Sequence, residues 1–238
     1  MRIKWLGHAA VMITSETGLR IITDPYEPGY HAFPAGSLMY DEITESADIV
    51  AITHEHPDHS ALPVRGNPEI VRGMEIRGKD SVNVKGIQFR AIPTFHDDMK
   101  GKLLGENTIL GCNVDGLWVY HSGDIGHALS SAQLGELGKV DVLLLCIGLI
   151  EKEGPDFTKF VIDTKAPIMS KICEQIEYKR LIPIHFRNSK CDFRFISVNE
   201  FLQGKRNVSY LDVSEVAFEK RSLDRRPDPE IVVLRPAK

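Results

Sequence analysis

The sequence predicts a single domain of mixed α/β class. Short apolar runs separated by turn residues fill the first two thirds of the chain, an almost continuous apolar run follows, and helical periodicity appears late. The chain has 238 residues, 42% hydrophobic and 26% charged, which is ordinary for a globular protein with a large core. Because no repeat, low-complexity segment or linker divides it, we predict one domain over residues 1–238.

Nine strands are predicted from the apolar runs. The Asp115-Gly116 pair between two such runs is a strong signal for a tight hairpin. The run Val140–Ile147 is typical of a central strand covered on both faces. The predicted strands are Ile3–Leu6, Ala10–Thr14, Leu19–Thr23, Ile49–Thr53, Ile87–Ile92, Thr108–Val114, Leu117–His121, Val140–Ile147 and Leu181–Ile184.

The strongest predicted helix is Thr164–Tyr178. Its residues Ile168, Ile172 and Ile176 recur every four positions, and Asp163 or Thr164 can cap its first turn. The remaining expectations are helical segments at Ser130–Leu137 and Val198–Leu202, and strands around charged turns over Val213–Lys238.

Composition excludes several classes of protein. The formal net charge of -4 and the pI of about 6.1 argue against a partner as acidic as nucleic acid. No apolar run is long enough for a membrane span, and the N-terminus lacks the layout of a signal peptide. The four cysteines show no CxxC spacing, and Cys146 is interpreted as a buried free thiol. We therefore expect a cytoplasmic protein without disulfides.

The segment Thr53-His-Glu-His-Pro-Asp-His-Ser60 is the clearest functional motif. It follows a predicted strand, and residues two apart in extended backbone point to the same side, so His54 and His56 can face one metal ion. Pro57 then turns the chain, which lets Asp58 and His59 point elsewhere. Imidazole and carboxylate together suit zinc, manganese or iron. An ordinary polar loop is the alternative, but a shuffled chain would contain this pattern only about once in a thousand.

This His-x-His-x-Asp-His pattern after a hydrophobic strand resembles the metallo-β-lactamase superfamily. Three later residues match that family in order, each after a predicted strand: His96 in Pro-Thr-Phe-His, Asp124 in His-Ser-Gly-Asp and His185 in Ile-Pro-Ile-His. The resemblance implies a four-layer αββα sandwich, with two mixed β-sheets flanked by helices. It also implies a site at the edge where the two sheets meet.

The resemblance implies a centre of two divalent metal ions, with zinc expected and manganese or iron as alternatives. Asp58 is expected to act in catalysis as well as in metal binding, because a carboxylate beside the attacking water can orient it or accept its proton. Flavo-diiron relatives have a glutamate where this chain has His56, so the histidine favours hydrolysis. By the resemblance, His54, His56 and His96 hold one metal, Asp58, His59 and His185 hold the second, and Asp124 bridges them.

Several segments are most similar to the branch that contains ascorbate-6-phosphate lactonase and its uncharacterised hydrolase relatives. They are Trp5-Leu-Gly-His-Ala-Ala, Thr23-Asp-Pro-Tyr and His121-Ser-Gly-Asp-Ile-Gly-His127. One segment departs from that branch. Relatives often carry a glycine-rich segment before the late helix, where this chain has Gly148–Thr158. Because such loops border the pocket, the substrate cannot be carried over from the branch.

Four further residues are candidates for supporting the ligands or the substrate. His8 can hydrogen-bond beneath the metal loop, or be a buried turn histidine. Asp24 resembles the aspartate that braces this loop in the family, with an Asp-Pro turn as the alternative. His127 can reach the pocket as a proton-transfer or supporting group, or begin a helix without a role. Arg187 begins a basic loop, 187–194, that could receive a phosphate or carboxylate, although a solvated loop is favoured.

Two acidic residues, Asp97 and Asp98, directly follow His96. We expect one of them to support the site and the other to be solvated. Glu106 and Asn107 are expected to fix the loop beneath His96, with a plain turn as the alternative.

The function predicted from the sequence is hydrolysis by a hydroxide that bridges two metal ions and attacks an ester, lactone or phosphoester. The expected substrate is a small anionic molecule, no membrane or nucleic acid is expected as a partner, and a homo-oligomer is compatible with the sequence. Two alternatives are a nuclease or phosphodiesterase acting on RNA or nucleotides, and a non-catalytic metal-binding protein of the same fold.

Overall fold

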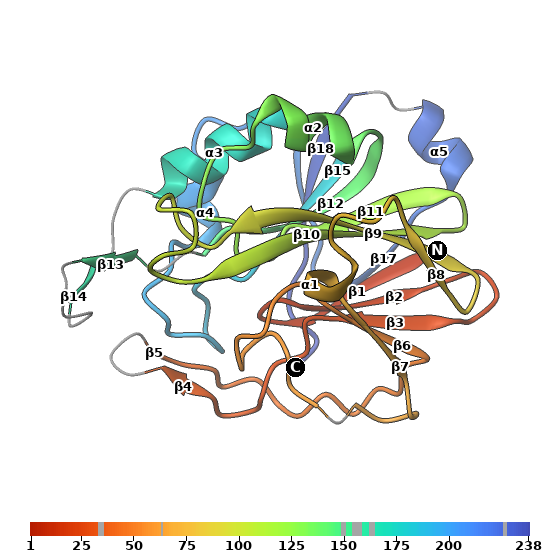
Figure 1. Ribbon diagram of the computed structural model, residues 1–238, viewed down its shortest axis with the longest axis horizontal. Coiled ribbons are helices and arrows are strands. Elements are labelled where there is room, and N and C mark those ends of the chain that lie inside the picture. Colours follow the sequence, from red (N-terminus) through yellow and green to blue (C-terminus); the bar gives the residue numbers. More distant parts are fainter. Residues whose placement is uncertain (33–35, 63, 149–150, 154–158, 162–164, 226–227) are drawn as a thin grey trace.

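The computed structural model of the protein describes residues 1–32, 36–62, 64–148, 151–153, 159–161, 165–225 and 228–238. Two large β-sheets face each other, and helices cover the outer side of one of them (Figure 1). The larger apolar core fills the space between the sheets and continues beneath the helices, and Trp5, Phe89 and Tyr120 within it are fully buried. The predicted α/β sandwich with two mixed sheets is therefore confirmed.

The first sheet carries the metal-binding motif. Strand β6 is buried along its whole length, which agrees with its apolar sequence Ile-Val-Ala-Ile, and it runs parallel to both of its neighbours. It ends immediately before Thr53 and the histidine-rich loop. In sheet order the strands are β17 (Glu215–Ala217), β1 (Arg2–Gly7), β2 (Ala10–Thr14), β3 (Arg20–Thr23), β6 (Ile49–Ile52) and β7 (Glu69–Arg72).

The second sheet has three parallel strands, β11, β12 and β15, at its centre. Next to them, β10 and β11 form the predicted hairpin, in which Val114 pairs with Leu117 and both turn residues have positive φ. In sheet order the strands are β16 (Val208–Tyr210), β18 (Glu230–Val233), β15 (Tyr178–Ile184), β12 (Val140–Cys146), β11 (Leu117–His121), β10 (Glu106–Val114), β9 (Ile87–Phe95) and β8 (Val82–Val84).

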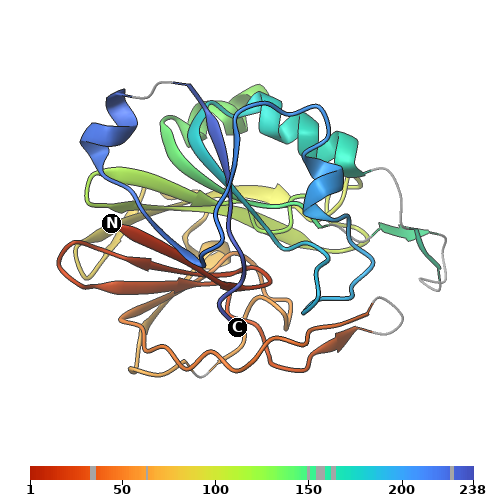
Figure 2. The ribbon, with the colours of Figure 1, turned by 180° about the vertical axis from the view of Figure 1, so that it is seen from behind.

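Helices α2 and α3 lie over the outer face of the second sheet (Figures 1 and 2). α2 begins at a capping box, because the side chain of Ser130 accepts from the backbone N–H of Gln133 and Gln133 reaches back. The expected caps of α3, Asp163 and Thr164, lie outside the described residues. The helices are α1 (Gly73–Ile76), α2 (Ser131–Leu137), α3 (Lys165–Gln175), α4 (Val198–Phe201) and α5 (Lys220–Arg225).

A different kind of layer covers the outer face of the first sheet. Leu38, Tyr40, Phe193 and Phe195 from two irregular segments pack with Ile22 and other sheet residues in a second apolar cluster. Among the described residues this layer contains no helix. Extended segments therefore cover the face of the sheet on which the resemblance implied helices. Two small hairpins also occur: β4 (His31–Ala32) with β5 (Gly36–Ser37), and β13 (Glu151–Glu153) with β14 (Lys159–Val161).

Some element predictions were wrong at their ends. The late helix was predicted to reach Tyr178, but it ends at Gln175 because Tyr178 already pairs with Val140 as the first residue of β15. The last segment was predicted to hold only strands, yet it contains α5 between β17 and β18. Tertiary pairing overrides local periodicity at such short elements.

Two expectations about the whole chain can be compared with the structure. All four cysteines are free and buried, as expected for a protein without disulfides. Within the described ranges, none of the helices has the length and apolar character needed to cross a membrane.

Glu45 anchors the C-terminal residue beside β1. Its carboxylate lies 2.8 Å from Nζ of Lys4 and 3.0 Å from Nζ of Lys238. Partial burial alone would raise the pKa of Glu45, but hydrogen bonds from the two lysines outweigh it and lower the pKa from 4.5 to about 2. A lowered pKa stabilises the fold above the unfolded value, and this contribution disappears as the pH falls from 4.5 to about 2.

We therefore expect Glu45→Gln to lower the free energy of unfolding at pH 7 by about 1 kcal/mol, the upper end for a solvent-accessible ion pair. The difference from the wild type should vanish as the pH falls through this window, measured by urea unfolding. Glu42→Gln is the matched control, because Glu42 is exposed and 3.6 Å from Arg65. An equal effect of both substitutions at pH 7 would contradict the prediction.

Candidate metal centre

The predicted metal ligands follow four strands that end at one edge of the sandwich. The loop after β6 carries the first four ligands, and β9, β11 and β15 lead to His96, Asp124 and His185. The carboxyl ends of β11 and β15 meet here because both run parallel to β12 between them. The structure brings all seven predicted ligands together, in two groups joined by Asp124.

The first group consists of His54, His56 and His96. Each offers one ring nitrogen, and these atoms lie within 4.8 Å of one another. Nε2 of His54 is 3.1 Å from Nδ1 of His56, and the ring of His96 contacts both other rings. Three imidazole nitrogens that converge in this way form a donor set for zinc or a similar divalent metal.

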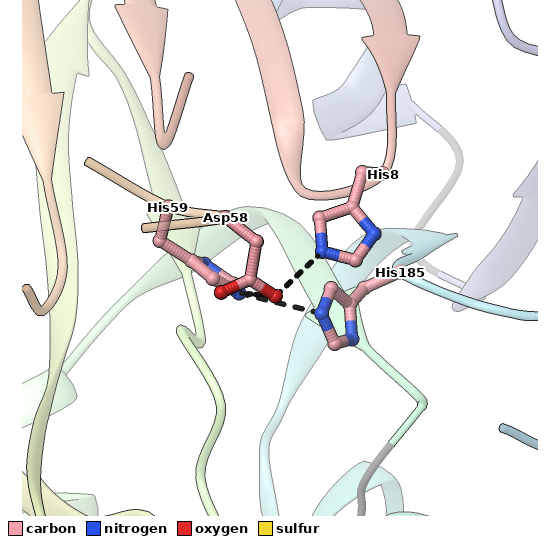
Figure 3. Close-up of side chains that lie close together, drawn as sticks. All are labelled: His8, Asp58, His59 and His185. Carbon is pink, nitrogen blue, oxygen red and sulfur yellow. Dashed lines mark hydrogen bonds and ion pairs between the residues drawn. The ribbon is translucent and has the colours of Figure 1, made fainter. Parts of the chain in front are cut away.

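The second group consists of His8, Asp58, His59 and His185, and Figure 3 shows their side chains pointing toward one another. Nε2 of His59 lies 3.3 Å from Nε2 of His185 and 3.9 Å from Oδ2 of Asp58. Nε2 of His8 lies 3.1 Å from the same carboxylate oxygen. His8 therefore touches a predicted ligand directly and holds the side chain of Asp58 in place.

Asp124 lies between the two groups. Its Oδ2 is 3.2 Å from Nε2 of His96, 3.3 Å from Nε2 of His59 and 3.6 Å from Nε2 of His185. Burial by itself would raise the pKa of this carboxyl group. The neighbouring His185 and His59, with hydrogen bonds from His59 and His96, outweigh burial and hold the pKa well below its ordinary value. Asp124 is therefore a carboxylate within reach of both groups.

The donor atoms fit bound cations. Among the described residues, Oδ1 of Asp124, Nδ1 of His96 and Nδ1 of His8 are buried without a hydrogen-bond partner. A buried polar atom without a partner costs free energy and indicates a ligand or ion that would satisfy it. For the orphaned carboxylate oxygen, which can only accept or coordinate, a cation is the natural partner. The residues present therefore fit divalent metal ions.

The histidines differ in their protonation. Burial lowers the pKa of His54, His56 and His185, so their rings are neutral and keep a free lone pair near pH 7. His59 differs because the carboxylates of Asp124 and Asp58 outweigh burial and raise its pKa well above 6.5.

Asp24 supports one histidine in each of the two donor groups through hydrogen bonds. Its Oδ1 accepts from the backbone N–H of Thr53, and its Oδ2 accepts from Oγ1 of Thr53 at 2.6 Å and from Nδ1 of His59 at 2.9 Å. Because the hydroxyl of Thr53 donates to Asp24, its oxygen is left to accept from Nδ1 of His54 at 3.0 Å. One buried carboxylate thus orients a ligand of each group and turns both Nε2 atoms inward.

Positive φ angles shape the backbone at three of these positions: His8 (φ 49°), Asp24 (φ 41°) and His185 (φ 57°). The turn at His8 lets its carbonyl accept from the backbone N–H of His185 at 3.0 Å and from Nε1 of Trp5 at 2.9 Å. Nδ1 of His185 in turn donates to the carbonyl of Gly148 at 2.8 Å. Such conformations are uncommon outside glycine and cluster where function requires them.

Asn107 positions Asp124 rather than the loop beneath His96. Its Oδ1 accepts from the backbone N–H of Asp124 at 3.1 Å, and its Nδ2 donates to Oγ1 of Thr94 and to the carbonyl of Ser122. Gly123 between them has a φ of 53°, and a Cβ at this position would collide with Oδ1 of Asn107. Only glycine fits this position of His-Ser-Gly-Asp, because the side chain of Asn107 approaches the backbone too closely for a Cβ atom.

The structure places two of the supporting candidates away from the ligand atoms. Nε2 of His127 accepts from the backbone N–H of Phe95 at 3.1 Å, and its Nδ1 lies 2.9 Å from the carbonyl of Ala128. Its ring therefore holds the end of β9, next to His96, and has no nitrogen left for proton transfer. Arg187 is half exposed and lies 3.4 Å from Glu200, so the structure does not bring it into the cluster.

Asp97 is a buried carboxylate directly behind His96, whereas Asp98 is exposed. Asp97 accepts four backbone N–H groups, from Met99, Gly101, Leu103 and Leu104, at 2.8–3.0 Å. Burial opposes its ionisation, but these hydrogen bonds outweigh burial and lower its pKa. It organises the loop that follows His96.

We expect Asp97→Ala to lower the affinity of the His54, His56 and His96 position for zinc by about 10-fold, the lower end for a supporting group, because Asp97 orders the loop after His96 without touching its ring. Competition with a chromophoric chelator measures this affinity. Asp98→Ala, one residue further on, should leave it unchanged. Equal affinities of the two variants would refute a positioning role for Asp97.

A cavity of about 770 Å³ lies beside the metal loop. Glu27, Glu42, Pro57 and Ser60 are among its lining residues, and none of the seven predicted ligands is. The metal-facing atoms therefore do not open into this cavity. Of the ligands, His56 and Asp58 are only partly buried, so the centre reaches solvent at these two side chains.

Comparison with known proteins identifies the class to which this fold and centre belong. Residues 2–185 match the family model described as the beta-lactamase superfamily domain. The chain therefore belongs to this superfamily, as the sequence motifs predicted. The narrower prediction of the ascorbate-6-phosphate lactonase branch stays a prediction.

Individual relatives agree with this membership. The UPF0173 metal-dependent hydrolase of Methanopyrus kandleri is 29% identical and aligns over 78% of this chain and 84% of its own. The one from Methanospirillum hungatei is 28% identical over 99% of this chain and 96% of its own. A crystal structure of a metallo-beta-lactamase superfamily protein from Thermotoga maritima has a TM-score of 0.69 and 25% identity, and the match covers 98% of this chain and 97% of that one.

Proposed function

We propose that this protein is a binuclear metal-dependent hydrolase that attacks an ester, lactone or phosphoester of a small anionic molecule. One observation carries the proposal: Oδ2 of Asp124 lies within 3.2–3.6 Å of imidazole nitrogens from both donor groups. A carboxylate shared by two clusters is suited to bridge two cations. The names of the relatives, which are metal-dependent hydrolases, support the same reaction class.

The proposed ligands divide as the two groups do. Two divalent metal ions, zinc first, with manganese or iron as alternatives, supply a water of lowered pKa and polarise the attacked carbonyl or phosphoryl oxygen. The orphaned Oδ1 of Asp124 supports the presence of cations. In this assignment His54, His56 and His96 hold one ion, Asp58, His59 and His185 hold the other, and Asp124 bridges them.

Asp58 is the proposed catalytic carboxylate. Burial opposes its ionisation, but His59 and the hydrogen bond from His8 outweigh burial and hold its pKa well below its ordinary value. It is therefore ionised and can orient the attacking water through a hydrogen bond or accept its proton. Its side chain is 14% exposed, more than those of His59 and His185 beside it, which supports a role for Asp58 at the solvent-facing side of the centre.

The charge of the loaded centre favours an anionic substrate. Two divalent ions contribute four positive charges, and Asp58, Asp124 and Asp24 contribute three negative ones, while the ligating histidines are neutral. An anionic group of the substrate that approaches the two ions is attracted to their positive charge, because charges act strongly in a mostly buried site. The basic loop does not supply this attraction, because Arg187 and Lys190 each lie 3.4 Å from a carboxylate, of Glu200 and Asp41 respectively.

The first measurement is the metal content of the purified protein. Purified protein should bind about two equivalents of zinc or manganese and hydrolyse members of a panel of small esters, lactones, phosphoesters and thioesters. His56→Ala should abolish both metal binding at one position and hydrolysis. His31→Ala is the control, because His31 is exposed and lies outside both donor groups.

Other outcomes would favour the alternatives. A metal-free protein that still hydrolyses the panel would overturn the proposal. Full metal occupancy without hydrolysis of any compound would favour a non-catalytic metal-binding protein. Tight, strongly salt-dependent RNA binding with RNA cleavage would favour a nuclease, which the net charge of -4 argues against.

A further inference from the structure

We propose that Sγ of Cys146 is a direct ligand of the metal ion held by Asp58, His59 and His185. The inference rests on the proposed binuclear centre and adds to it a sulfur donor. The sequence indicated only a buried thiol in an apolar strand, because nothing local to Val140–Cys146 marks its last residue as special.

The topology places Cys146 at the centre of the site. β12 lies between β11 and β15 and runs parallel to both. β11 leads to Asp124 and β15 to His185, and Cys146 itself pairs with Ile184, the residue before His185. The carboxyl ends of three neighbouring parallel strands therefore deliver a carboxylate, a thiol and an imidazole to one edge of the sheet.

The side chains of these three residues converge. A carboxylate oxygen of Asp124, Sγ of Cys146 and a ring nitrogen of His185 lie within 4.8 Å of one another. All three residues are buried, and Cys146 is fully so. The Nδ1 atom of His185 is engaged with the carbonyl of Gly148, so Nε2 is the atom that can face a metal ion.

A second observation points to a cation beside the thiol. Oδ2 of Asp124 faces three imidazoles, whereas its Oδ1 is buried without a hydrogen bond of regular geometry among the described residues, and the Cys146 thiol lies close enough to interact with this carboxylate. The backbone N–H of Cys146 is bonded to Oγ of Ser122, which fixes the end of β12 at this point. A metal ion coordinated by the carboxylate and the thiolate would satisfy both side chains.

The chemistry of the donor set favours zinc for this position. Thiolate, imidazole and carboxylate together are typical of zinc sites, whereas sulfur is a poor ligand for manganese. On binding, the thiol loses its proton to solvent and the sulfur forms the bond to the metal. The other cysteines have no such surroundings: Cys112, for example, is buried in β10 and belongs to none of the donor groups.

X-ray absorption of the wild-type protein loaded with two equivalents of zinc tests the proposal without any substitution. A sulfur ligand gives a zinc–sulfur shell at about 2.3 Å, beside the nitrogen and oxygen shell at about 2.0–2.1 Å. We expect both shells, with sulfur averaging one half per zinc ion. A spectrum described by nitrogen and oxygen alone overturns the proposal while leaving the hydrolase function intact. Failure to bind zinc at all overturns both.

Two cysteine variants provide an independent readout. The cobalt-substituted wild type and Cys112→Ser should show a near-ultraviolet sulfur-to-cobalt charge-transfer band, which Cys146→Ser should lack. Cys146→Ser should also weaken zinc binding at one position by about 10- to 100-fold and change manganese binding less. Identical spectra for wild type and Cys146→Ser would refute ligation, and would leave the thiol as a neighbour of Asp124.

Discussion

Asp124→Asn should cost the protein at least one of its two metal ions and lower kcat/KM by roughly 1000-fold or more, about 4 kcal/mol of transition-state stabilisation. The reason is the position of the carboxylate. It lies 3.2 Å from His96 of the first group, and 3.3 Å and 3.6 Å from His59 and His185 of the second. Asparagine keeps the shape but removes the negative charge that two cations share.

Metal analysis of the dialysed variant and kinetics on whichever panel compound the wild type hydrolyses measure the two effects. Asp98→Asn is the matched control, since it removes an exposed carboxylate two residues after His96. Circular dichroism shows whether the variant is folded. A folded Asp124→Asn protein that retains two metal ions and full activity would disprove a bridging role.

Removal of the metal ions should lower the melting temperature by roughly 15–30 °C. At a free metal concentration about 1000-fold above the dissociation constant, each ion adds about 4 kcal/mol to the stability of the folded state. For a chain of this size about 1 kcal/mol corresponds to 2–4 °C. The metal-free centre keeps buried histidines and carboxylates close together, with three polar atoms left without partners. These unfavourable contacts are relieved when cations bind.

Calorimetry with and without a chelator measures this shift, and re-addition of zinc should restore the original transition. The chelator should have a clearly smaller effect on His56→Ala, because that variant has already lost a ligand of the first group. An unchanged melting temperature in the wild type, at demonstrated metal removal, would show that the folded state does not depend on the centre.

The fold was largely predictable because its central strands are long and apolar. β12 is buried throughout and was recognised from an uninterrupted apolar run, and the β10–β11 hairpin from its Asp-Gly turn. Strands at sheet edges, such as β7 and β8, escaped prediction because they are short and partly exposed. Their conformation comes from pairing with a neighbour rather than from a local pattern.

The ligands were predictable for a different reason. The motif from His54 to His59 is local, and its resemblance to the metallo-β-lactamase superfamily implied three further ligands, which His96, Asp124 and His185 match in order. The residues that position these ligands were harder to predict from the sequence. Asp97 and Asp98 are adjacent and chemically alike, yet only the first turns inward to bind four backbone groups. Sequence cannot separate such a pair, because burial depends on the path of the loop.

By itself, the sequence determined the histidine-rich loop and the mixed α/β class, because motif spacing and apolar periodicity are written along the chain, and through its family resemblance it predicted the seven ligands. Only the tertiary structure decided which other residues contact and support the predicted ligands. It joined Asp24 to His54 and His59, turned Arg187 toward Glu200 and brought Cys146 beside Asp124. Such contacts join distant segments and depend on strand order and backbone angles, which no local pattern records.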